Sequence, residues 1–406
     1  MATILLIGTL DTKWAEYAFV RDRLTDAGVA TIVVDVGVQG EPGFRPDITR
    51  EEVAGSVGAD VVALAEAGDR GAAVATMARG AAEWVAKLHR EGRCDAALAL
   101  GGTGGTSLAS QAMRVLPLGV PKVIVSTVAS GDTGPYIGES DLVLMPSVVD
   151  IAGVNRLSTR ILANAAASVA GMATTTQPPD TGTKPVIAAS MFGVTTACVT
   201  AARERLEELG YEVLVFHMTG AGGRTLESLA HEGYLAGVLD ITTTELADEL
   251  VGGVFSAGAK RLTGAAAAGV PQVVSVGALD MVNFGRKDTV PPQFADRNLY
   301  LHNPNVTLMR TTPSECAELG KRLAERVSAA TAPAAVFLPL RGVSSIATEG
   351  GPFHDADADE VLFSAIRRHL NRDAVEIVES DKEINDPDFA IAMAERLHQM
   401  VKATAS

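Results

Sequence analysis

The segment 101–106 has the residue types of a turn that binds phosphate. It reads Gly101-Gly-Thr-Gly-Gly-Thr106 after an apolar run, so four glycines leave backbone amides uncovered where a helix is expected to begin near Ser107. Amides in that position attract an anion. The pattern is neither G-x-G-x-x-G nor a P-loop, and a tight turn that merely needs glycine is the alternative. The candidate phosphate ligands are Gly101, Gly102, Thr103, Gly104, Gly105 and Thr106.

A second candidate turn lies between the first apolar run and a helical pattern. Asp11 or Thr12 is expected to cap that helix. The amides of the helix start, together with the charge of Lys13, suit a phosphate group. An ordinary capped turn with a solvated lysine explains the same residues. The candidates in this turn are Gly8, Thr9, Asp11, Thr12 and Lys13.

Two later segments of the first half add hydroxyl groups, a carboxylate and an arginine. The segment 126–132 follows an apolar run and could line a phosphate or ribose, or position Mg²⁺ through water, although its residues also form common turns. Arg156 opens a helical pattern, where it could bind a phosphate through two hydrogen bonds or simply be solvated. The candidates here are Ser126, Ser130, Gly131, Asp132, Asn155 and Arg156.

The second half of the chain carries polar groups where further strands are expected to end. Histidine titrates near neutrality, so His217 and His302 are candidate acid–base catalysts, with Asp280 as a third candidate; a structural histidine is the alternative. Loops that carry arginine, amide and hydroxyl groups could hold a small anionic substrate. The candidate substrate-binding residues are Gly222, Gly223, Asp240, Asn283, Arg297, Asn303, Arg341 and Ser344.

Two other patterns in the second half favour structural roles. Thr242-x-x-Glu245 is typical of a capping box, and the acidic residues 355–360 are typical of a helix start. Convergence of His217, Asp280, His302 and Asp357 on a divalent metal stays open, because spacing along a sequence does not establish proximity in space.

Apolar runs that alternate with helical patterns predict the elements that position these residues. In the first half, strands are expected over 4–7, 30–34, 96–100, 120–125 and 142–145, with helices over 13–27, 71–91 and 155–172. Continuous apolar strands indicate a parallel sheet covered on both faces. The carboxyl ends of such strands lie at one edge, where ligands of open α/β sheets bind. The candidate turns are therefore expected to meet at that edge.

The sequence predicts two Rossmann-like α/β domains with mostly parallel sheets. The first is expected over 1–175, a proline-containing linker over 176–185, and the second over 186–406, with a last helix over 386–402 that could pack on either domain. Leu24, Gly28 and Asp35 match Leu206, Gly210 and His217 at identical offsets, which indicates an internal repeat.

Composition narrows the class of protein. A net charge of −15 argues against nucleic acid as a partner, because no basic stripe is present to replace counterions. The three widely spaced cysteines predict reduced thiols in a cytoplasmic protein. The apolar start of the chain reads as a strand and not as a signal peptide, and no run is long enough to span a membrane.

Five segments together resemble those of a known family. They are Gly8-Thr-Leu-Asp-Thr-Lys, Gly101-Gly-Thr-Gly-Gly-Thr, Val125-Ser-Thr-Val-Ala-Ser-Gly-Asp, Asp150-Ile-Ala-Gly-Val-Asn-Arg and Gly277-Ala-Leu-Asp-Met-Val-Asn-Phe-Gly. The chain is similar over nearly its whole length to bacterial and fungal proteins related to the ATP-binding N-terminal region of a plant tobamovirus-resistance protein. The resemblance implies two Rossmann-like subdomains, ATP in the first, and a tendency to form homodimers.

Three roles follow as hypotheses. The first is an enzyme that binds ATP, with Mg²⁺, in the first domain and a small anionic substrate in a cleft against the second. The second is a nucleotide-gated interaction module without turnover. The third is a metal-dependent hydrolase or lyase centred on the second domain, with the nucleotide as a regulator. A plain dehydrogenase is disfavoured because the glycine fingerprint is absent.

Overall fold

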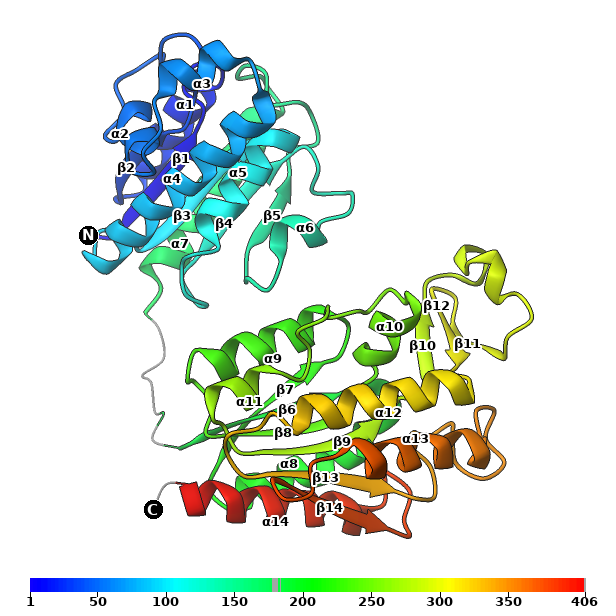
Figure 1. Cartoon of the computed structure of the whole chain (residues 1–406). Coiled ribbons are helices and arrows are strands. Elements are labelled where there is room, and N and C mark those ends of the chain that lie inside the picture. Colours follow the sequence, from blue (N-terminus) through cyan, green and yellow to red (C-terminus); the bar gives the residue numbers. More distant parts are fainter. Residues whose placement is uncertain (177–181, 183, 405–406) are drawn as a thin grey trace. The chain divides into compact units, whose positions relative to one another are not determined.

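A computed structural model of the chain describes residues 1–176, 182 and 184–404. The chain divides into two compact units, 1–179 and 180–406, each treated by itself below (Figure 1). Most of the predicted linker, 177–181 and 183, lies outside the described residues. No helix in the described parts of the chain is long and apolar enough to cross a membrane.

Unit 1 is a five-stranded parallel sheet with strand order β2-β1-β3-β4-β5. Its strands are β1 (Thr3–Gly8), β2 (Ala30–Asp35), β3 (Ala96–Gly101), β4 (Lys122–Ser126) and β5 (Val143–Pro146). Its helices are α1 (Trp14–Asp26), α2 (Arg50–Gly55), α3 (Val61–Ala67), α4 (Arg70–Arg90), α5 (Thr103–Met113), α6 (Gly134–Ile137) and α7 (Ser158–Thr174). Each of the five apolar runs predicted as strands forms a strand.

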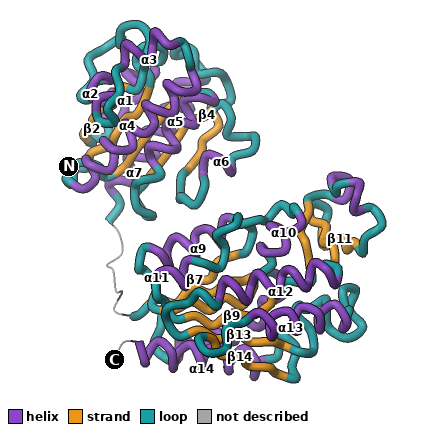
Figure 2. The backbone as a smooth tube through the Cα atoms, in the orientation of Figure 1, coloured by secondary structure: helices purple, strands orange, loops and turns teal. Residues whose placement is uncertain are grey.

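Helices cover both faces of the unit 1 sheet, as the apolar strands predict (Figure 2). Successive side chains of β1 point to opposite faces, so Leu5 and Ile7 pack with α4 and α5, while Ile4 and Leu6 pack with α1 and α7. This alternation follows from the two-residue period of a strand. Two separate cores hold the carboxyl ends of the strands in place.

Unit 2 is a six-stranded parallel sheet with strand order β14-β13-β9-β8-β6-β7. Its strands are β6 (Val186–Met191), β7 (Glu212–His217), β8 (Gly237–Thr242), β9 (Gln272–Gly277), β13 (Ala334–Pro339) and β14 (Val375–Ser380). Its helices are α8 (Thr196–Glu208), α9 (Ala221–His231), α10 (Glu245–Val251), α11 (Gly264–Ala268), α12 (Pro313–Val327), α13 (Ala356–His369) and α14 (Pro387–Thr404). The last helix, α14, packs with α8 on unit 2.

A small antiparallel sheet interrupts unit 2 between β9 and β13. It consists of β10 (Met281–Phe284), β11 (Leu299–Asn303) and β12 (Val306–Arg310), in the order β10-β12-β11. The apolar run 307–309, a strand expected from the sequence, lies in the central strand β12, whereas the outward-facing residues of β11 are polar or exposed.

The two units repeat one topology. A single offset in residue number relates α1 to α8 and β2 to β7, and β2-β1-β3-β4 of unit 1 corresponds to β7-β6-β8-β9 of unit 2. Gly28 and Gly210, which end the first helix of each unit, both have positive φ angles. The repeat inferred from three matched residue pairs therefore extends to the strand order.

The Tyr17 hydroxyl ties the two central strands of unit 1 together. It donates to the Ile7 carbonyl at 2.5 Å and accepts from the Leu100 amide at 2.7 Å, in a fully buried position. We expect Tyr17→Phe to lower the free energy of unfolding by about 1–3 kcal/mol, because a buried amide loses its acceptor.

Both tryptophans, Trp14 and Trp84, lie in unit 1, so tryptophan fluorescence during urea unfolding reports this unit in the intact chain. Tyr136→Phe is the matched control, because the Tyr136 hydroxyl has no hydrogen-bond partner among the described residues. Equal urea midpoints for the Tyr17 and Tyr136 variants would contradict the assigned role.

Candidate functional site

The two glycine-containing turns of unit 1 lie at neighbouring strand ends. Gly8 ends β1 and Gly101 ends β3, and these strands are parallel neighbours. From β1 the chain continues to β2 on one side, and it returns to β3 on the other. This is the topological switch point of the sheet, where ligands of open α/β folds bind. The structure therefore brings both predicted turns to one edge.

The 101–106 turn is shorter than predicted because α5 begins at Thr103 and not near Ser107. Its N-cap is Gly102, and no described side chain caps the helix. A Cβ on Gly101 would lie 2.8 Å from the Gly105 carbonyl carbon, so the tight turn itself requires glycine there. The first-turn amides of α5, which have no partner within a helix, are thus left without a side-chain acceptor.

The hydroxyl groups of Thr106 and Ser126 serve the fold. Their Oγ atoms lie 2.7 Å apart, both residues are almost completely buried, and Ser126 also accepts from the Val128 amide at 3.1 Å. They join the end of β4 to the first turn of α5. Their hydrogen-bonding capacity is therefore used within the protein.

The predicted side-chain cap of α1 is wrong. Asp11 Oδ2 accepts from the Gln39 amide at 2.9 Å, and the hydroxyls of Thr9 and Thr12 pair at 3.0 Å, so neither candidate caps the helix. Lys13 is the N-cap residue, and its Nζ atom donates to the Ile151 carbonyl at 2.5 Å. Asp11 Oδ1 is buried and has no donor among the described residues.

A cation that the sequence analysis missed lies beside the first turn of α5. Arg70 is the first residue of α4, and its Nη2 atom is 3.6 Å from where a Cβ on Gly104 would be. It forms no ion pair with any residue that the structure describes. The adjacent Asp69 accepts from the Ala72 amide as the cap of α4. A cation beside a helix N-terminus is unfavourable unless an anion is present. The sequence signal that could have identified Arg70 is an arginine at the start of a helical pattern.

The other predicted residues of unit 1 follow β4 and β5. Ser130, Gly131 and Asp132 form an exposed turn, in which Asp132 accepts from the Gly134 amide at 3.2 Å. Asn155 lies just before α7 and accepts from the amides of Leu157 and Ser158, at 3.0 Å each. The Arg156 side chain is exposed and has no hydrogen bond or ion pair with a described residue. These residues share the sheet edge with the glycine turns.

In unit 2 the same switch point is filled by the protein itself. Thr242, the last residue of β8, takes the position of Gly101, and its hydroxyl pairs with that of Thr195 at 2.7 Å. Its amide donates to Ser190 Oγ at 2.8 Å, and the Thr243 hydroxyl donates to the Ser275 carbonyl at 3.1 Å. All these residues are completely buried. Side chains with internal partners thus replace the open glycines of unit 1.

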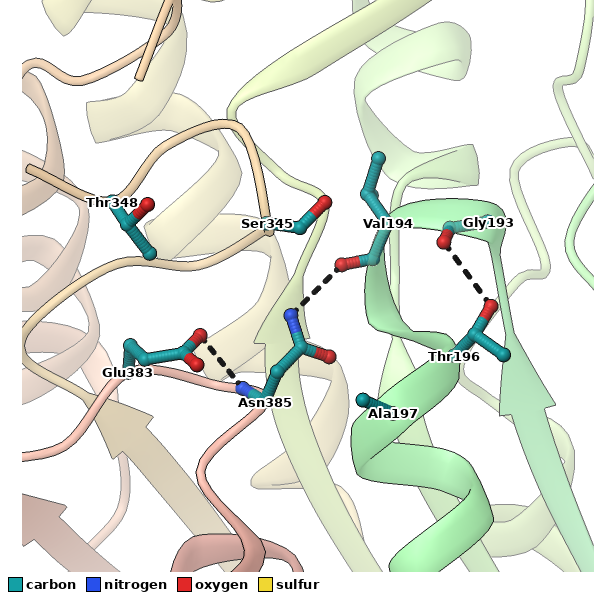
Figure 3. Close-up of a pocket in the computed structure, with 8 residues that line it drawn as sticks. All are labelled: Gly193, Val194, Thr196, Ala197, Ser345, Thr348, Glu383 and Asn385. Carbon is teal, nitrogen blue, oxygen red and sulfur yellow. Dashed lines mark hydrogen bonds between the residues drawn. The ribbon is translucent and has the colours of Figure 1, made fainter. Parts of the chain in front are cut away.

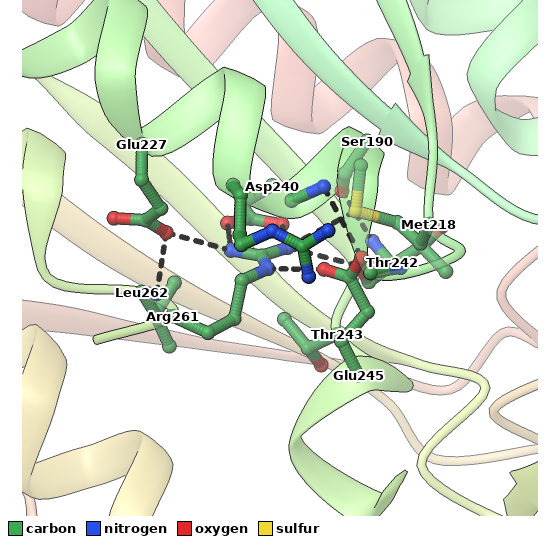
Figure 4. A network of polar contacts seen from close by, with 12 residues as sticks. Ser190, Met218, Glu227, Asp240, Thr242, Thr243, Glu245, Arg261 and Leu262 are labelled. Carbon is green, nitrogen blue, oxygen red and sulfur yellow. Dashed lines mark hydrogen bonds and ion pairs between the residues drawn. The ribbon is translucent and has the colours of Figure 1, made fainter. Parts of the chain in front are cut away.

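A buried arginine organises the rest of this region (Figure 4). The Arg261 side chain is fully buried and binds both oxygens of Asp240, at 2.5 and 2.7 Å. It also binds Glu245 at 2.6 Å and Glu227 at 3.2 Å. Burial raises the pKa of Glu245, and the attraction of Arg261 opposes that rise. Asp240, a predicted substrate ligand, is therefore occupied by an ion pair.

The predicted anion site at Gly222 and Gly223 is occupied by a carboxylate of the protein. Glu245 Oε1 accepts from the amides of Gly220 and Gly223, at 2.7 and 3.1 Å. A Cβ on Gly223 would lie 1.9 Å from Glu245 Oε2, and one on Gly222 would lie 1.9 Å from the His217 carbonyl oxygen. The capping box expected at Thr242 is wrong, because Glu245 caps a different helix, α9.

The structure does not link the candidate catalytic residues to one another by hydrogen bonds. His217 ends the edge strand β7, with its ring 5.3 Å from that of Phe192, and partial burial lowers the pKa of its imidazole. His302 lies exposed on β11. No hydrogen bond links either histidine side chain to Asp280 within the described residues. Among those residues, no three His, Cys, Asp or Glu side chains could hold a metal ion, which leaves Asp357 outside any such group.

Asp280 and Asn283 are buried at the two ends of β10. Ser344 donates to Asp280 Oδ2 at 2.8 Å, while Oδ1 has no partner among the described residues. Burial raises the pKa of Asp280 to about 7. Asn283 donates through its amide and its side chain to Asp248, both at 2.7 Å, and burial raises the pKa of Asp248 to about 7 as well. These groups attach the small sheet to its surroundings.

The remaining predicted substrate ligands have partners within unit 2. Arg297 binds both oxygens of Glu315, at 3.1 and 2.7 Å. Arg341 forms an exposed ion pair with Asp381, and Asn303 accepts from the amide of Asn305 at 2.9 Å in the β11–β12 turn. Both arginines therefore have a carboxylate as counter-ion.

A pocket of about 530 Å³ opens at the carboxyl edge of the unit 2 sheet (Figure 3). The loops after β6, β13 and β14 supply its lining, which includes Gly193, Thr196, Ser345, Thr348, Glu383 and Asn385. The lining contains a carboxylate and no basic side chain, so it differs from the glycine-lined edge of unit 1. The sequence analysis did not single out these residues.

Sequence comparison assigns the chain to a family. Residues 2–178 match the Uncharacterised protein family (UPF0261) N-terminal domain, and residues 184–401 match the C-terminal domain of the same family. The chain belongs to the UPF0261 family. It is 52% identical to a UPF0261 protein of Clostridium tetani, over 98% of this chain and 99% of that protein. It is 40% identical to the ToMV resistance protein Tm-1(GCR237) of Solanum lycopersicum, over 97% of this chain and 55% of that protein, which confirms the resemblance seen in the motifs.

Solved structures show weaker similarity. UDP-GlcNAc 2-epimerase from Methanocaldococcus jannaschii aligns over 99% of this chain and all of its own, with 9% identity and a TM-score of 0.24. The esterase domain of a Rhodothermus marinus protein aligns over 56% of this chain and 90% of its own, with 16% identity and a TM-score of 0.29. Values this low transfer no ligand or activity to the UPF0261 chain.

Replacing Arg261 tests the buried network. We expect Arg261→Met to lower the free energy of unfolding of unit 2 by about 3–5 kcal/mol, because three carboxylates lose their shared cation. Far-UV circular dichroism of the intact chain measures the loss, and tryptophan fluorescence identifies the unit 1 transition separately. Arg341→Met, which removes an exposed pair, should leave the transitions nearly unchanged. Equal effects of the two substitutions would contradict a structural role for the network.

The raised pKa of Asp280 predicts a pH dependence of stability. Its pKa is about 7 in the folded state against 3.8 as the ordinary value, so between these values only the folded state keeps the proton. This group therefore makes stability fall as pH rises from about 4 to 7, by at most about 1.4 kcal/mol per pH unit.

The Asp280→Asn variant removes this contribution. The free energy of unfolding of the variant minus that of the unchanged chain should be larger at pH 8 than at pH 5. Urea unfolding followed by circular dichroism measures this difference. Asp381→Asn is the control, because the hydrogen bond from Arg341 lowers the pKa of that exposed carboxylate. The assignment fails if the difference between Asp280→Asn and the unchanged chain is the same at both pH values.

Proposed function

We propose that unit 1 binds the phosphates of a nucleotide at the switch point between β1 and β3. The observation that carries the proposal is the cation Arg70 beside the α5 N-terminus, where no described side chain supplies an acceptor or a negative charge. Both features favour an anion, and glycine leaves room for it. The nucleotide implied by the motif resemblance is ATP.

The residues of the switch point suit a polyphosphate. The amides of Thr103, Gly104 and Gly105 in the first turn of α5 would donate hydrogen bonds, and Arg70 would contribute a bidentate, charged contact. Mg²⁺ that accompanies ATP needs only one or two protein carboxylates besides phosphate oxygens and water. Asp11, whose Oδ1 atom has no donor among the described residues, fits that role.

A dinucleotide fits this site less well than ATP. In dinucleotide-binding folds, a carboxylate at the end of the second strand holds a ribose hydroxyl. Here that residue is Asp35, which binds Arg50 at 2.7 Å and accepts the amides of Leu10 and Gly37 at 3.1 and 2.9 Å. Asp35 is completely buried, so its carboxylate is committed to the fold.

Of the three roles considered, a nucleotide-gated binding protein of the cytoplasm has the most support. Arg297 and Arg341, the cations expected to hold an anionic substrate, are paired with carboxylates. His217, His302 and Asp280 share no hydrogen bond among the described residues, so no acid–base set supports turnover. The three cysteines are buried free thiols, which suits a reducing compartment.

Unit 2 suggests a direct test of the nucleotide site. Gly104 lies three residues beyond the end of β3, as Glu245 lies three residues beyond the end of β8. We expect Gly104→Glu to place a carboxylate beside Arg70 and to weaken ATP binding at least about tenfold, because the new charge replaces the phosphate. Isothermal titration calorimetry with ATP and Mg²⁺ measures the change.

Gly104→Ala is the matched control, since only Arg70 lies within 4 Å of a Cβ there, and it should keep the affinity within about twofold. Arg70→Ala should weaken binding about 10- to 100-fold, and Arg79→Ala, on the same helix, should not. Absence of heat with ATP for the unchanged chain, or unaltered binding by Gly104→Glu, would overturn the proposal.

A further inference from the structure

Trp14 is a half-exposed aromatic residue next to the proposed phosphate site. We infer that its indole ring is the surface on which the base of the bound nucleotide stacks. The inference rests on the proposed function and deepens it: the ligand is a nucleotide with its base, and not a polyphosphate alone. Four observations carry it: the position of Trp14, its packing, its lack of partners and the space around it.

Trp14 directly follows the Gly8–Lys13 turn, as the first residue of α1. Its side chain is packed against Gly43, where a Cβ would lie 2.1 Å from the indole Cγ atom. The amide of Gly43 donates to the Leu10 carbonyl at 3.0 Å, which holds the loop after β2 against the same turn. The ring is therefore fixed at the carboxyl edge of the sheet, on the β2 side of the switch point.

The indole of Trp14 has no ring, cation or hydrogen-bond partner among the described residues, although it is 48% exposed. Phe44 and Trp84 of unit 1 do have such partners. Arg21 lies over the Phe44 ring at 4.6 Å, and Lys87 lies over the Trp84 ring at 4.4 Å. The indole of Trp84 also donates to the Glu52 carbonyl. Trp14 thus differs from Phe44 and Trp84 because it offers an unpartnered ring at the ligand edge.

The loop opposite Trp14, which follows β2, carries three glycines. Gly37, Gly40 and Gly43 occur at every third position, and the Asp11 carboxyl lies where a Cβ on Gly37 would be, 2.8 Å from its carbon. A side chain at Gly43 would displace the indole. Glycine at this position keeps the half-exposed ring in place as a flat apolar surface, which suits a nucleobase.

This placement orients the nucleotide across the switch point. The base lies on the β2 side over Trp14, and the phosphates lie on the β3 side, over α5 and beside Arg70. Stacking is tolerant of base identity because every base offers a π-face. The site is therefore expected to accept ATP and GTP with similar affinity.

The experiment uses the intact chain with Trp84→Phe, so that Trp14 is its only tryptophan. Trp84 lies about 20 Å from Arg70 along α4, at 1.5 Å per residue, so its replacement should leave binding unchanged. ATP should quench Trp14 fluorescence with the affinity measured by calorimetry, and inorganic tripolyphosphate should bind with little quenching.

A second variant separates stacking from phosphate binding. Trp14→Leu should weaken ATP and GTP binding about 5- to 150-fold and leave tripolyphosphate affinity within about twofold. Trp14→Phe should retain most of the ATP affinity. Circular dichroism checks that each variant folds, and the quenching measurement needs no change at Trp14.

The outcomes distinguish this inference from the proposed function. If tripolyphosphate binds, but ATP binds no tighter or leaves Trp14 fluorescence unchanged, the stacking inference is overturned and the phosphate site stands. Equal ATP affinity of Trp14→Leu and the unchanged chain overturns stacking in the same way. If neither ATP nor tripolyphosphate binds, both proposals fall together.

Discussion

The unpaired amides of helices that begin at the carboxyl edge of a parallel sheet constrain both units. The first-turn N–H groups of such a helix have no partner within it and need an acceptor. In unit 2, Glu245 supplies the acceptor for α9, and Arg261 balances its charge. In unit 1, the counterpart of α9 is α4, whose first turn is capped by Asp69. The helix α5 instead begins at a glycine cap with Arg70 alongside, and no described side chain caps it. The protein therefore supplies an acceptor for α9 and α4 and leaves the first turn of α5 without one.

This difference explains why similar glycine patterns have different meanings. The glycines at 220–223 are required because Glu245 and the His217 carbonyl occupy the space of their missing side chains. Gly104, in contrast, has only the end of a flexible arginine within reach. A glycine is needed for packing where a neighbouring atom occupies the position of its missing side chain. A glycine that faces open space beside a free cation is available to a ligand. The sequence alone does not distinguish the two.

The sequence predicted the sheets well because buried parallel strands are continuous apolar runs that end at glycine or polar residues. It placed the start of α5 too late, since Gly104 and Gly105 weaken a helical pattern that tertiary contacts restore. The ion network could not be predicted from the sequence, because Arg261 contacts Glu227 and Asp240 only when three elements have packed together. Arg70 and Trp14 were missed for the same reason: neither belongs to a motif, and their roles depend on the loops that they face.

The charge of the chain and the charge of its proposed ligand can be reconciled by distance. A net charge of −15 repels a polyanion. In physiological salt this repulsion is weak at distances beyond the Debye length of about 8–10 Å. Within the site, oriented amides and Arg70 act at hydrogen-bonding distance, where screening is slight. A nucleic acid would need cations spread along its backbone, whereas a single triphosphate needs only one favourable edge. The acidic surface and the open α5 N-terminus therefore both suit the small phosphate ligand that we propose.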